Sequence, residues 1–330
     1  MEASFVIPLY NCLELTQAGL RSLRATLPAG LEHEIILVDD GSTDGTRGWL
    51  RDQASSTGPV DGPPVRVLLN ERNLGFAAAC NRGAATAQGE FLFLLNNDLV
   101  FLPGWFGPMR AVFARRADTG LVGNVQLAAA TGAVDHAGLF FDRLGKPVHD
   151  TARPWWARLA GLRPVPAVTG ACLAIRRRDW RAFGGFDEGY VNGGEDVDLC
   201  LRALDAGRRN YVALRSVVRH HVSRSPGRKR HDEENSRRLT VCWRHLIATL
   251  AAPDWSRHYL DREWQGPRDP GDFAVACAAW ASSLGWRRHP SIPVARGVQL
   301  AVEVELARWR TLLDGAPPAE PSPASEPLVL

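Results

Sequence analysis

The sequence predicts an α/β protein built on a mostly parallel sheet. Over the first 125 residues, short apolar runs alternate with segments of helical periodicity, a pattern typical of βαβ units. The apolar runs at 35–38 and 91–95 are continuous rather than alternating, which indicates strands that are buried on both faces. The 330 residues are 45% hydrophobic and 23% charged, an ordinary globular composition with enough chain to bury a sizeable core.

Each expected strand of this first half is followed by polar residues. We expect strands at 4–9, 34–38, 65–69 and 90–95, and helices at 13–27 and 75–88. The polar runs stand at 8–11, 39–45, 70–76 and 96–98. Because ligands of parallel sheets bind beyond the carboxyl ends of the strands, these four runs are predicted to meet at one site.

The pattern changes after about residue 150. We expect a loop or insertion at 151–166, a strand at 168–175, a helix at 195–206 and one or two strands at 211–218. A basic loop at 223–230 precedes a helix at 234–250, and two further helices are expected near 273–284 and 294–313. The Pro- and Ala-rich end, 315–330, is expected to be disordered.

Several classes of protein are excluded by composition. The formal net charge of +3 argues against a surface built for nucleic acid. No stretch approaches the roughly 20 apolar residues that cross a bilayer, and the N-terminus lacks the pattern of a signal peptide. The six cysteines, at 12, 80, 172, 200, 242 and 277, form no CxxC pair. We interpret them as small buried residues in a reducing compartment rather than as a disulfide or zinc framework.

Acidic residues follow two of the expected strands. Asp39 and Asp40 precede Gly41-Ser42, and a carboxylate in that place can bind a ribose hydroxyl or a base N–H. A helix cap is the alternative, because Ser42 is a good N-cap residue. No GxGxxG follows the first strand, which argues against a dinucleotide site.

The second acidic segment is Asn96-Asn97-Asp98. A carboxylate there is a hard-oxygen ligand suited to Mg²⁺ or Mn²⁺, a cation that takes its other ligands from water and substrate phosphates. An Asx turn that ends the strand is the alternative.

Two later segments also contain candidate catalytic or metal-ligating residues. Glu195 and Asp196 begin a helix after two glycines, where a carboxylate can act as a general base or only complement the helix dipole. His220 and His221 end an apolar strand and can offer a metal ligand. The run of arginines that follows suits diphosphate, although part of it is expected to be a solvated helix face.

Taken together, these segments resemble one known family. The residues that carry the resemblance are FVIPLYN (5–11), ILVDDGSTD (36–44), NLGFAAACN (73–81), LLNND (94–98), TGAC (169–172), FGGFDE (183–188) and EDVDL (195–199). Over about residues 3–245 the chain resembles the inverting family 2 glycosyltransferases, and most closely their rhamnosyltransferase-like branch. The resemblance implies the GT-A fold, a Rossmann-like nucleotide-binding sheet fused to an acceptor-binding half, here with a C-terminal helical extension.

The resemblance also implies domain boundaries and roles for single residues. The catalytic domain spans 1–245, divided into a nucleotide-sugar-binding half (1–125) and an acceptor-binding half (126–245), before the extension (246–314) and the tail (315–330). Asp196 matches the catalytic base, beside Glu195, and Asp98 with His220 matches the metal site. The implied nucleotide-binding residues are Pro8, Tyr10, Asn11, Asp40, Asn73, Asn81 and Asn97. The implied diphosphate or acceptor region holds Gly170, His221, Ser223, Arg224 and Arg228.

The function that follows is transfer of a sugar from a nucleotide-diphospho-sugar donor to a hydroxyl of a saccharide or lipid-linked acceptor, with Mg²⁺ or Mn²⁺, in bacterial surface glycan synthesis. A non-catalytic nucleotide-sugar-binding protein on the same fold is the alternative. We expect the protein in the cytoplasm or at the inner face of the membrane. For the residues after 245, ordinary packing or a homodimer interface is favoured over a membrane-surface contact, because no continuous basic face is present.

Overall fold

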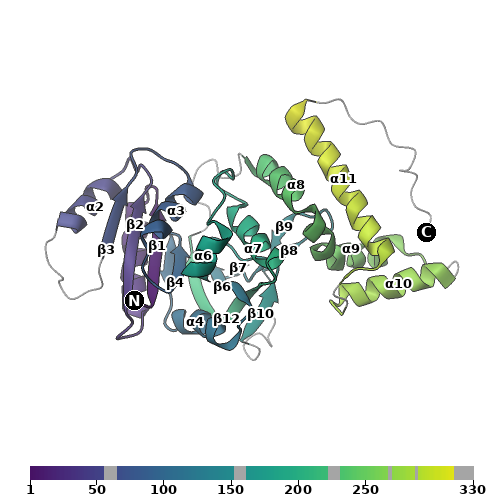
Figure 1. Cartoon of the computed structure of the whole chain (residues 1–330), viewed down its shortest axis with the longest axis horizontal. Helices are drawn as coiled ribbons and strands as arrows, with labels where there is room; N and C mark the ends of the chain where they lie inside the picture. Colours follow the sequence, from purple (N-terminus) through teal and green to yellow (C-terminus); the bar gives the residue numbers. More distant parts are fainter. Residues whose placement is uncertain (56–64, 152–160, 222–230, 267–269, 287–288, 316–330) are drawn as a thin grey trace. The chain divides into compact units, whose positions relative to one another are not determined.

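The computed structural model describes residues 1–55, 65–151, 161–221, 231–266, 270–286 and 289–315. The chain divides into two compact units, the first formed by 1–139 with 149–231, and the second by 140–148 with 232–330. Helix α8 (Asp232–Leu250) belongs to the second unit, because it packs with the helices that follow it. Each unit is described separately below (Figure 1).

The first unit is built on a mixed sheet with the strand order β10-β12-β6-β11-β4-β1-β2-β3. Strands β1 (Ala3–Leu9), β2 (His33–Asp39), β3 (Val65–Leu69) and β4 (Phe91–Leu95) are parallel, which confirms the four strands expected in the first half. All residues of β1 and β4 are buried, as their continuous apolar sequence predicts.

The remaining strands complete the sheet on the other side of β4. Strand β11 (Cys172–Arg176) runs antiparallel to β4 and to β6 (Thr119–Ala128). Strand β12 (Arg209–His220), longer than the expected 211–218, runs parallel to β6. The edges carry β5 (Leu99–Phe101), β7 (Val134–His136) and β10 (Leu162–Val165). The expected loop at 151–166 is therefore wrong for Leu162–Val165, because this segment pairs with β12; residues 152–160 lie outside the described chain.

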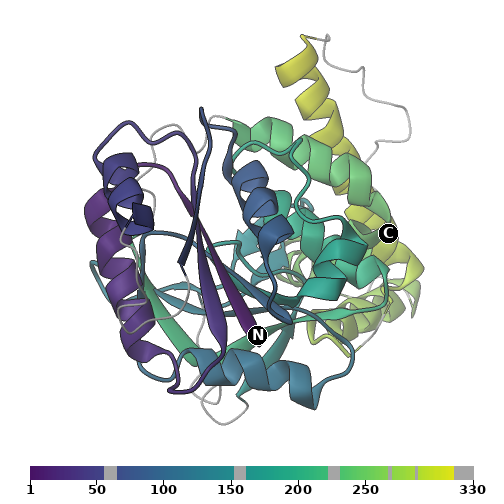
Figure 2. The same ribbon diagram turned by 60° about the vertical axis from the view of Figure 1, so that its left-hand side comes forward.

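Helices cover the sheet of the first unit (Figure 2). They are α1 (Leu13–Thr26), α2 (Thr46–Ser55), α3 (Phe76–Thr86), α4 (Phe106–Arg115), α6 (Arg177–Phe183) and α7 (Glu195–Asp205). Helix α3 lies very close to the sheet, since a Cβ on Gly83 would stand 2.4 Å from the side chain of Val6. On the core side, Phe5 packs against Phe93 with ring centroids 5.2 Å apart, and Trp105 is fully buried beside them.

The second unit joins the short strands β8 (Leu139–Phe141) and β9 (Pro147–His149) to a set of helices. After α8 come α9 (Ala252–His258), the π-turn η2 (Tyr259–Glu263), α10 (Pro270–Ser283) and α11 (Ile292–Asp314). Trp309 is fully buried and donates its indole N–H to Glu233. Lys146, from the β8–β9 connection, lies 3.1 Å from the buried Glu305, so α11 fastens this connection by an ion pair.

Helix α10 presents apolar side chains at its surface. Phe273 and Trp280, two helical turns apart, are each about half exposed, as is Leu284 just after the end of the helix. None of the helices in the described ranges is long and apolar enough to traverse a bilayer.

The cysteines follow the sequence interpretation only in part. Cys80, Cys172 and Cys200 are buried, but Cys242 and Cys277 are exposed. The expectation that all six are buried is therefore wrong, because α8 and α10 each have one face that no described segment of their unit covers.

Candidate active site

A cleft of about 230 Å³ lies at the carboxyl ends of β1, β2 and β4, in the first unit. This is the edge at which the sequence places its polar runs, and it is the expected place for a ligand of a parallel sheet. Eight of the predicted site residues line it, namely Pro8, Tyr10, Asp40, Asn73, Asn97, Asp98, Gly170 and Glu195. Leu9, Gly75, Phe76, Ala79, Asn96, Thr169, Ala171 and Asn192 complete the lining.

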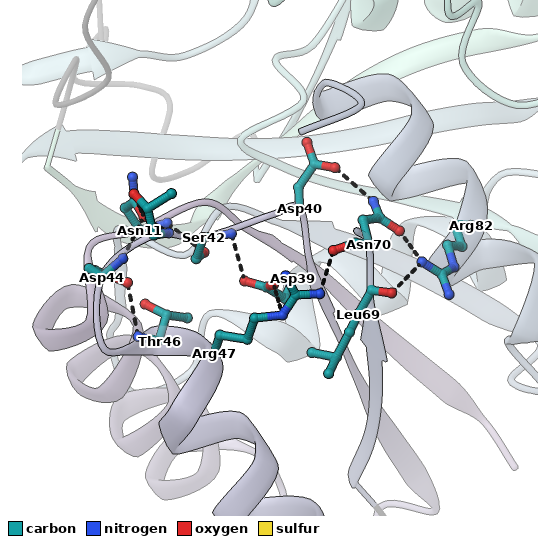
Figure 3. A network of polar contacts seen from close by, with 11 residues as sticks. Asn11, Asp39, Asp40, Ser42, Asp44, Thr46, Arg47, Leu69, Asn70 and Arg82 are labelled. Atoms are coloured by element: carbon teal, nitrogen blue, oxygen red, sulfur yellow. Dashed lines mark hydrogen bonds and ion pairs between the residues drawn. The ribbon is translucent and has the colours of Figure 1, made fainter. Parts of the chain in front are cut away.

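Asp40 organises one wall of the cleft. Its Oδ1 accepts hydrogen bonds from Asn70 Nδ2 at 2.7 Å and from Leu74 N at 2.9 Å, while its Oδ2 accepts one from Gly75 N at 2.9 Å. Arg82 in turn donates to Asn70 Oδ1 (Figure 3). The carboxylate is 3% exposed, and because two oxygens offer about four acceptor positions, it retains capacity for one further donor at the cleft.

Asn11 holds the loop that follows β2 against the end of β1. It occupies a left-handed conformation with φ 59°, which Asn tolerates better than most residues. Its Oδ1 accepts from Thr43 N at 2.8 Å, and its own N–H donates to Ser42 Oγ at 2.8 Å. Asp44 then accepts from Thr46 N at the start of α2. Asn11 does not line the cleft, and its described contacts position the 39–45 loop (Figure 3).

The segment after β4 places three polar residues at the floor of the cleft. Asn97 donates from Nδ2 to Thr16 Oγ1 at 2.9 Å and to the backbone carbonyl of Asn11 at 3.2 Å, so it fastens this segment to α1. Asn96 Oδ1 is buried and has no hydrogen-bond partner among the described residues, while Asp98 Oδ1, also buried, faces the ring of His220. Buried oxygens of this kind normally have a partner, which points to a ligand at this position.

Asp98 faces His220 across the junction of two strands. Asp98 Oδ1 lies 3.3 Å from His220 Nε2, and the imidazole is 5% exposed. The backbone fixes this pairing, because His221 N donates to the carbonyl of Asp98 at 3.0 Å. Burial lowers the pKa of His220, but the carboxylates of Asp135 and Asp98 outweigh burial and raise it to about 9.

These atoms fit a divalent cation that also needs substrate. Two ligand atoms about 2.1 Å from one octahedral cation stand about 3 Å apart, close to the separation of Asp98 Oδ1 and His220 Nε2. In the described ranges no three His, Cys, Asp or Glu side chains converge into a complete metal site. A cation held here would therefore take most of its ligands from phosphate oxygens and water.

The first turn of α7 forms another wall. Asp196 Oδ2 accepts a hydrogen bond from Gly170 N at 2.6 Å, and its Oδ1 accepts from Val197 N at 2.8 Å. Glu195 lines the cleft and accepts from Gly193 N at 2.8 Å. A Cβ on Gly170 would stand 3.3 Å from the Asp196 Cβ, so the absence of a side chain at 170 lets this carboxylate lie against the backbone.

The other predicted residues fall outside the cleft lining. Asn81 accepts from Phe186 N and donates to Glu188 Oε1, so its amide holds the 186–188 loop on α3. His221 contributes its backbone N–H to Asp98. Ser223, Arg224 and Arg228 lie outside the described residues, as does most of the basic loop. Sequence reasoning did not select Thr169, Phe76 or Asn192 as site residues, although Thr169 and Phe76 belong to the segments that carry the resemblance.

The comparison with curated proteins finds relatives in surface glycan synthesis. An O-antigen biosynthesis protein of Myxococcus xanthus is 29% identical over 316 residues, which cover 91% of this chain and 22% of that protein. An N-acetylglucosaminyl-diphospho-decaprenol L-rhamnosyltransferase of Mycobacterium tuberculosis is 29% identical over 217 residues, covering 59% of this chain and 68% of that protein. A Sinorhizobium fredii protein, y4gI, is 31% identical, and the chain spans about a quarter of it.

Solved structures share the fold. A structure of GalNAc-T7 with UDP, GalNAc and Mn²⁺ superposes with a TM-score of 0.61 at 18% identity, over 83% of this chain and 53% of that one. Residues 1–349 of TarS from S. aureus superpose with a TM-score of 0.56 at 14% identity, over 96% of this chain and 92% of that one. These likenesses confirm the GT-A fold. The model of "Glycosyl transferase family 2" matches residues 4–177, so the chain belongs to glycosyl transferase family 2.

Proposed function

We propose that the chain is an inverting glycosyltransferase that moves a sugar from a nucleotide-diphospho-sugar to a hydroxyl of a saccharide or lipid-linked acceptor in bacterial surface glycan synthesis. One observation carries this proposal. Asp40, Asp98 and Glu195 line a single cleft, with His220 3.3 Å from Asp98 and Asp196 bonded to Gly170, which also lines the cleft. Recognition of a nucleoside, neutralisation of a diphosphate and removal of a proton need these three kinds of group.

The donor nucleoside is assigned to the wall formed by Pro8, Tyr10 and Asp40. Tyr10 is 45% exposed at the cleft and offers a ring face to a base. Asp40 retains acceptor capacity for an N–H of the base, while its existing hydrogen bonds hold Leu74 and Gly75 in place. Asn73, at the same wall, supplies amide groups within the cleft.

Asp98 and His220 are the residues that would hold Mg²⁺ or Mn²⁺. When bound, such a cation neutralises the charge that develops on the departing diphosphate. The chain's own contribution is to present one carboxylate oxygen and one ring nitrogen, both buried and 3.3 Å apart. GalNAc-T7, which shares the fold, binds Mn²⁺ together with UDP, which supports this choice of cation.

Asp196 is assigned as the general base. It takes the proton of the acceptor hydroxyl while that oxygen forms a bond to the anomeric carbon. The bond from that carbon to the phosphate oxygen breaks, and a nucleoside diphosphate leaves. A single displacement from the opposite face inverts the configuration. The Gly170 N–H hydrogen bond holds this carboxylate in place beside the cleft.

The acceptor side remains open between a saccharide and a lipid-linked sugar. One relative is named for a decaprenol-linked substrate, which favours a lipid-linked acceptor and a site in the cytoplasm at the inner face of the membrane. The exposed Phe273 and Trp280 of α10, with Leu284 just after it, offer a surface for that membrane or for a second copy of the chain. Flotation with vesicles and light scattering would separate these two uses.

A donor panel tests the proposed function. The protein is incubated with UDP-, dTDP- and GDP-sugars and Mn²⁺, with saccharide and prenyl-diphosphate-linked acceptors, and free nucleoside diphosphate is measured. We expect one donor to release diphosphate in an acceptor-dependent manner, and Asp196→Asn to abolish the release. Donor binding with no transfer to any acceptor would favour the non-catalytic alternative.

A further inference from the structure

His220 lies between two carboxylates rather than beside one. Its Nε2 lies 3.3 Å from Asp98 Oδ1, and its Nδ1 lies 3.7 Å from Asp135 Oδ2, just beyond hydrogen-bond length. The two carboxylates therefore face opposite nitrogens of one ring. Asp98 lines the cleft, so Nε2 is the nitrogen on the cleft side and Nδ1 points away from it.

A backbone irregularity brings Asp135 to this position. In the antiparallel pair of β6 and β7, Gln126 pairs with His136 and Leu127 pairs with Val134. Asp135 is consequently an extra residue in β7, with no residue opposite it. A β-bulge of this kind redirects a side chain and is common beside active sites.

His136, the residue after Asp135, holds strand β7 in place. His136 is fully buried, and its Nε2 accepts a hydrogen bond from Gly138 N at 3.2 Å. The proton therefore resides on Nδ1, which lies 3.2 Å from His149 Nδ1. These contacts fix β7, while the side chain of Asp135 itself is 29% exposed.

We propose that Asp135 is a positioning residue for the metal site, whose carboxylate accepts a hydrogen bond from Nδ1–H of His220 and so leaves Nε2 free to ligate Mg²⁺ or Mn²⁺. A carboxylate on the distal nitrogen of a ligating histidine fixes the tautomer and the ring orientation, and raises the basicity of the ligating nitrogen. The inference rests on the proposed metal dependence of the enzyme.

Mn²⁺ binding tests the inference without donor or acceptor. The affinity of the full chain for Mn²⁺ alone is measured from the electron paramagnetic resonance signal of free Mn²⁺. Asp135→Ala is expected to weaken binding about 10- to 100-fold. Asp135→Asn, whose amide oxygen can still accept a hydrogen bond from Nδ1–H, is expected to retain more of the affinity than Asp135→Ala. Asp118→Asn, a carboxylate of the same unit that pairs instead with Tyr211, is the matched control and should bind as the wild type does.

A double-mutant cycle distinguishes positioning from a general loss of structure. In a His220→Ala background, Asp135→Ala should cause less than a twofold further loss of Mn²⁺ affinity, because the ring that it orients is gone. Thermal unfolding of each variant reports folding separately. Wild-type affinity in folded Asp135→Ala, or an equal loss in both backgrounds, would overturn the inference and leave the proposed function in place. Failure of the wild type to bind Mn²⁺ both alone and with a nucleoside diphosphate would overturn the inference and the proposed metal dependence, whereas the donor panel tests sugar transfer separately.

Discussion

The backbone N–H of Gly170 donates a hydrogen bond of 2.6 Å to Asp196 Oδ2, across 26 residues of sequence. The bond ties the segment before β11 to the first turn of α7, and it holds the carboxylate beside a residue that lines the cleft. Glu195, the preceding residue, lines the cleft directly. The two neighbouring carboxylates thus have different surroundings, and substitution can separate their roles.

Asp196→Asn should lower sugar transfer by about 10²- to 10⁴-fold, the usual contribution of a general base, with donor affinity nearly unchanged. Glu195→Gln is the matched control, because its amide oxygen can still accept from Gly193 N, and it should lose less than about tenfold. Steady-state transfer and donor titration measure both. A larger loss in Glu195→Gln than in Asp196→Asn would move the base to Glu195.

Gly41→Ala should destabilise the protein by at least about 2 kcal/mol more than Gly30→Ala. Both glycines have a left-handed φ, +77° and +79°, which costs a residue with a Cβ about 1–2 kcal/mol. Only at Gly41 would the Cβ also meet backbone, at 2.6 Å from Asn73 N, where the Asp40 wall is built. Denaturant unfolding measures the difference, and Gly48→Ala, in open space within α2, should be neutral or stabilising.

Asp98→Ala should weaken Mn²⁺ binding by more than about 100-fold, since a direct ligand contributes more than the outer partners of a metal site. Chelation by EDTA should lower transfer by the wild type, and Mn²⁺ or Mg²⁺ should restore it. Calorimetry with Mn²⁺ alone and transfer assays after metal addition measure these effects. Full activity in EDTA, with unchanged Mn²⁺ binding by Asp98→Ala, would contradict the metal assignment.

The fold should lose stability in mild acid through His136. Burial, with a smaller contribution from His149, lowers the pKa of His136 from 6.5 to about 3. Below pH 6.5 the His136 side chain is protonated in the unfolded chain but stays neutral in the folded chain. The free energy of unfolding therefore falls as the pH falls from 6.5 towards 3. From pH 6.5 to pH 5 this contribution amounts to about 2 kcal/mol.

His136→Gln measures that contribution. The variant is expected to be less stable than the wild type at pH 7.5, because His136 is buried and bonded. The difference in unfolding free energy between pH 7.5 and pH 5 should nevertheless shrink by about 2 kcal/mol, which urea titrations at the two pH values detect. An unchanged difference would show that His136 titrates normally in the folded chain.

Sequence pattern alone is enough to predict the parallel half of the sheet and the edge at which the site lies. A continuous apolar run such as Phe91–Leu95 predicts a strand that is buried on both faces of the sheet. The polar residues that follow each such strand lie at the edge formed by the carboxyl ends of the parallel strands. The family resemblance then assigned Asp40, Asp98, Glu195 and Asp196 to the site, and the structure places three of them in the cleft lining and Asp196 against it. The short strands β5, β7 and β10 were not predicted, because segments of three or four residues form strands through pairing with neighbouring strands rather than through their own propensity.

The contacts of each site residue could not be predicted from sequence pattern, because they depend on how distant elements pack. Asn81, expected at the nucleotide, gives its amide to Phe186 and Glu188, a loop that lies more than 100 residues away in sequence. Asp135 carries no signal in the sequence, since its place beside His220 depends on an extra residue in β7 and on the strand order β7-β6-β12. Sequence periodicity reports which face of an element is buried, whereas the contacts of a polar side chain depend on which distant elements pack beside it. The contacts of the polar side chains at this cleft therefore depend on which strands pair and which loops pack beside them.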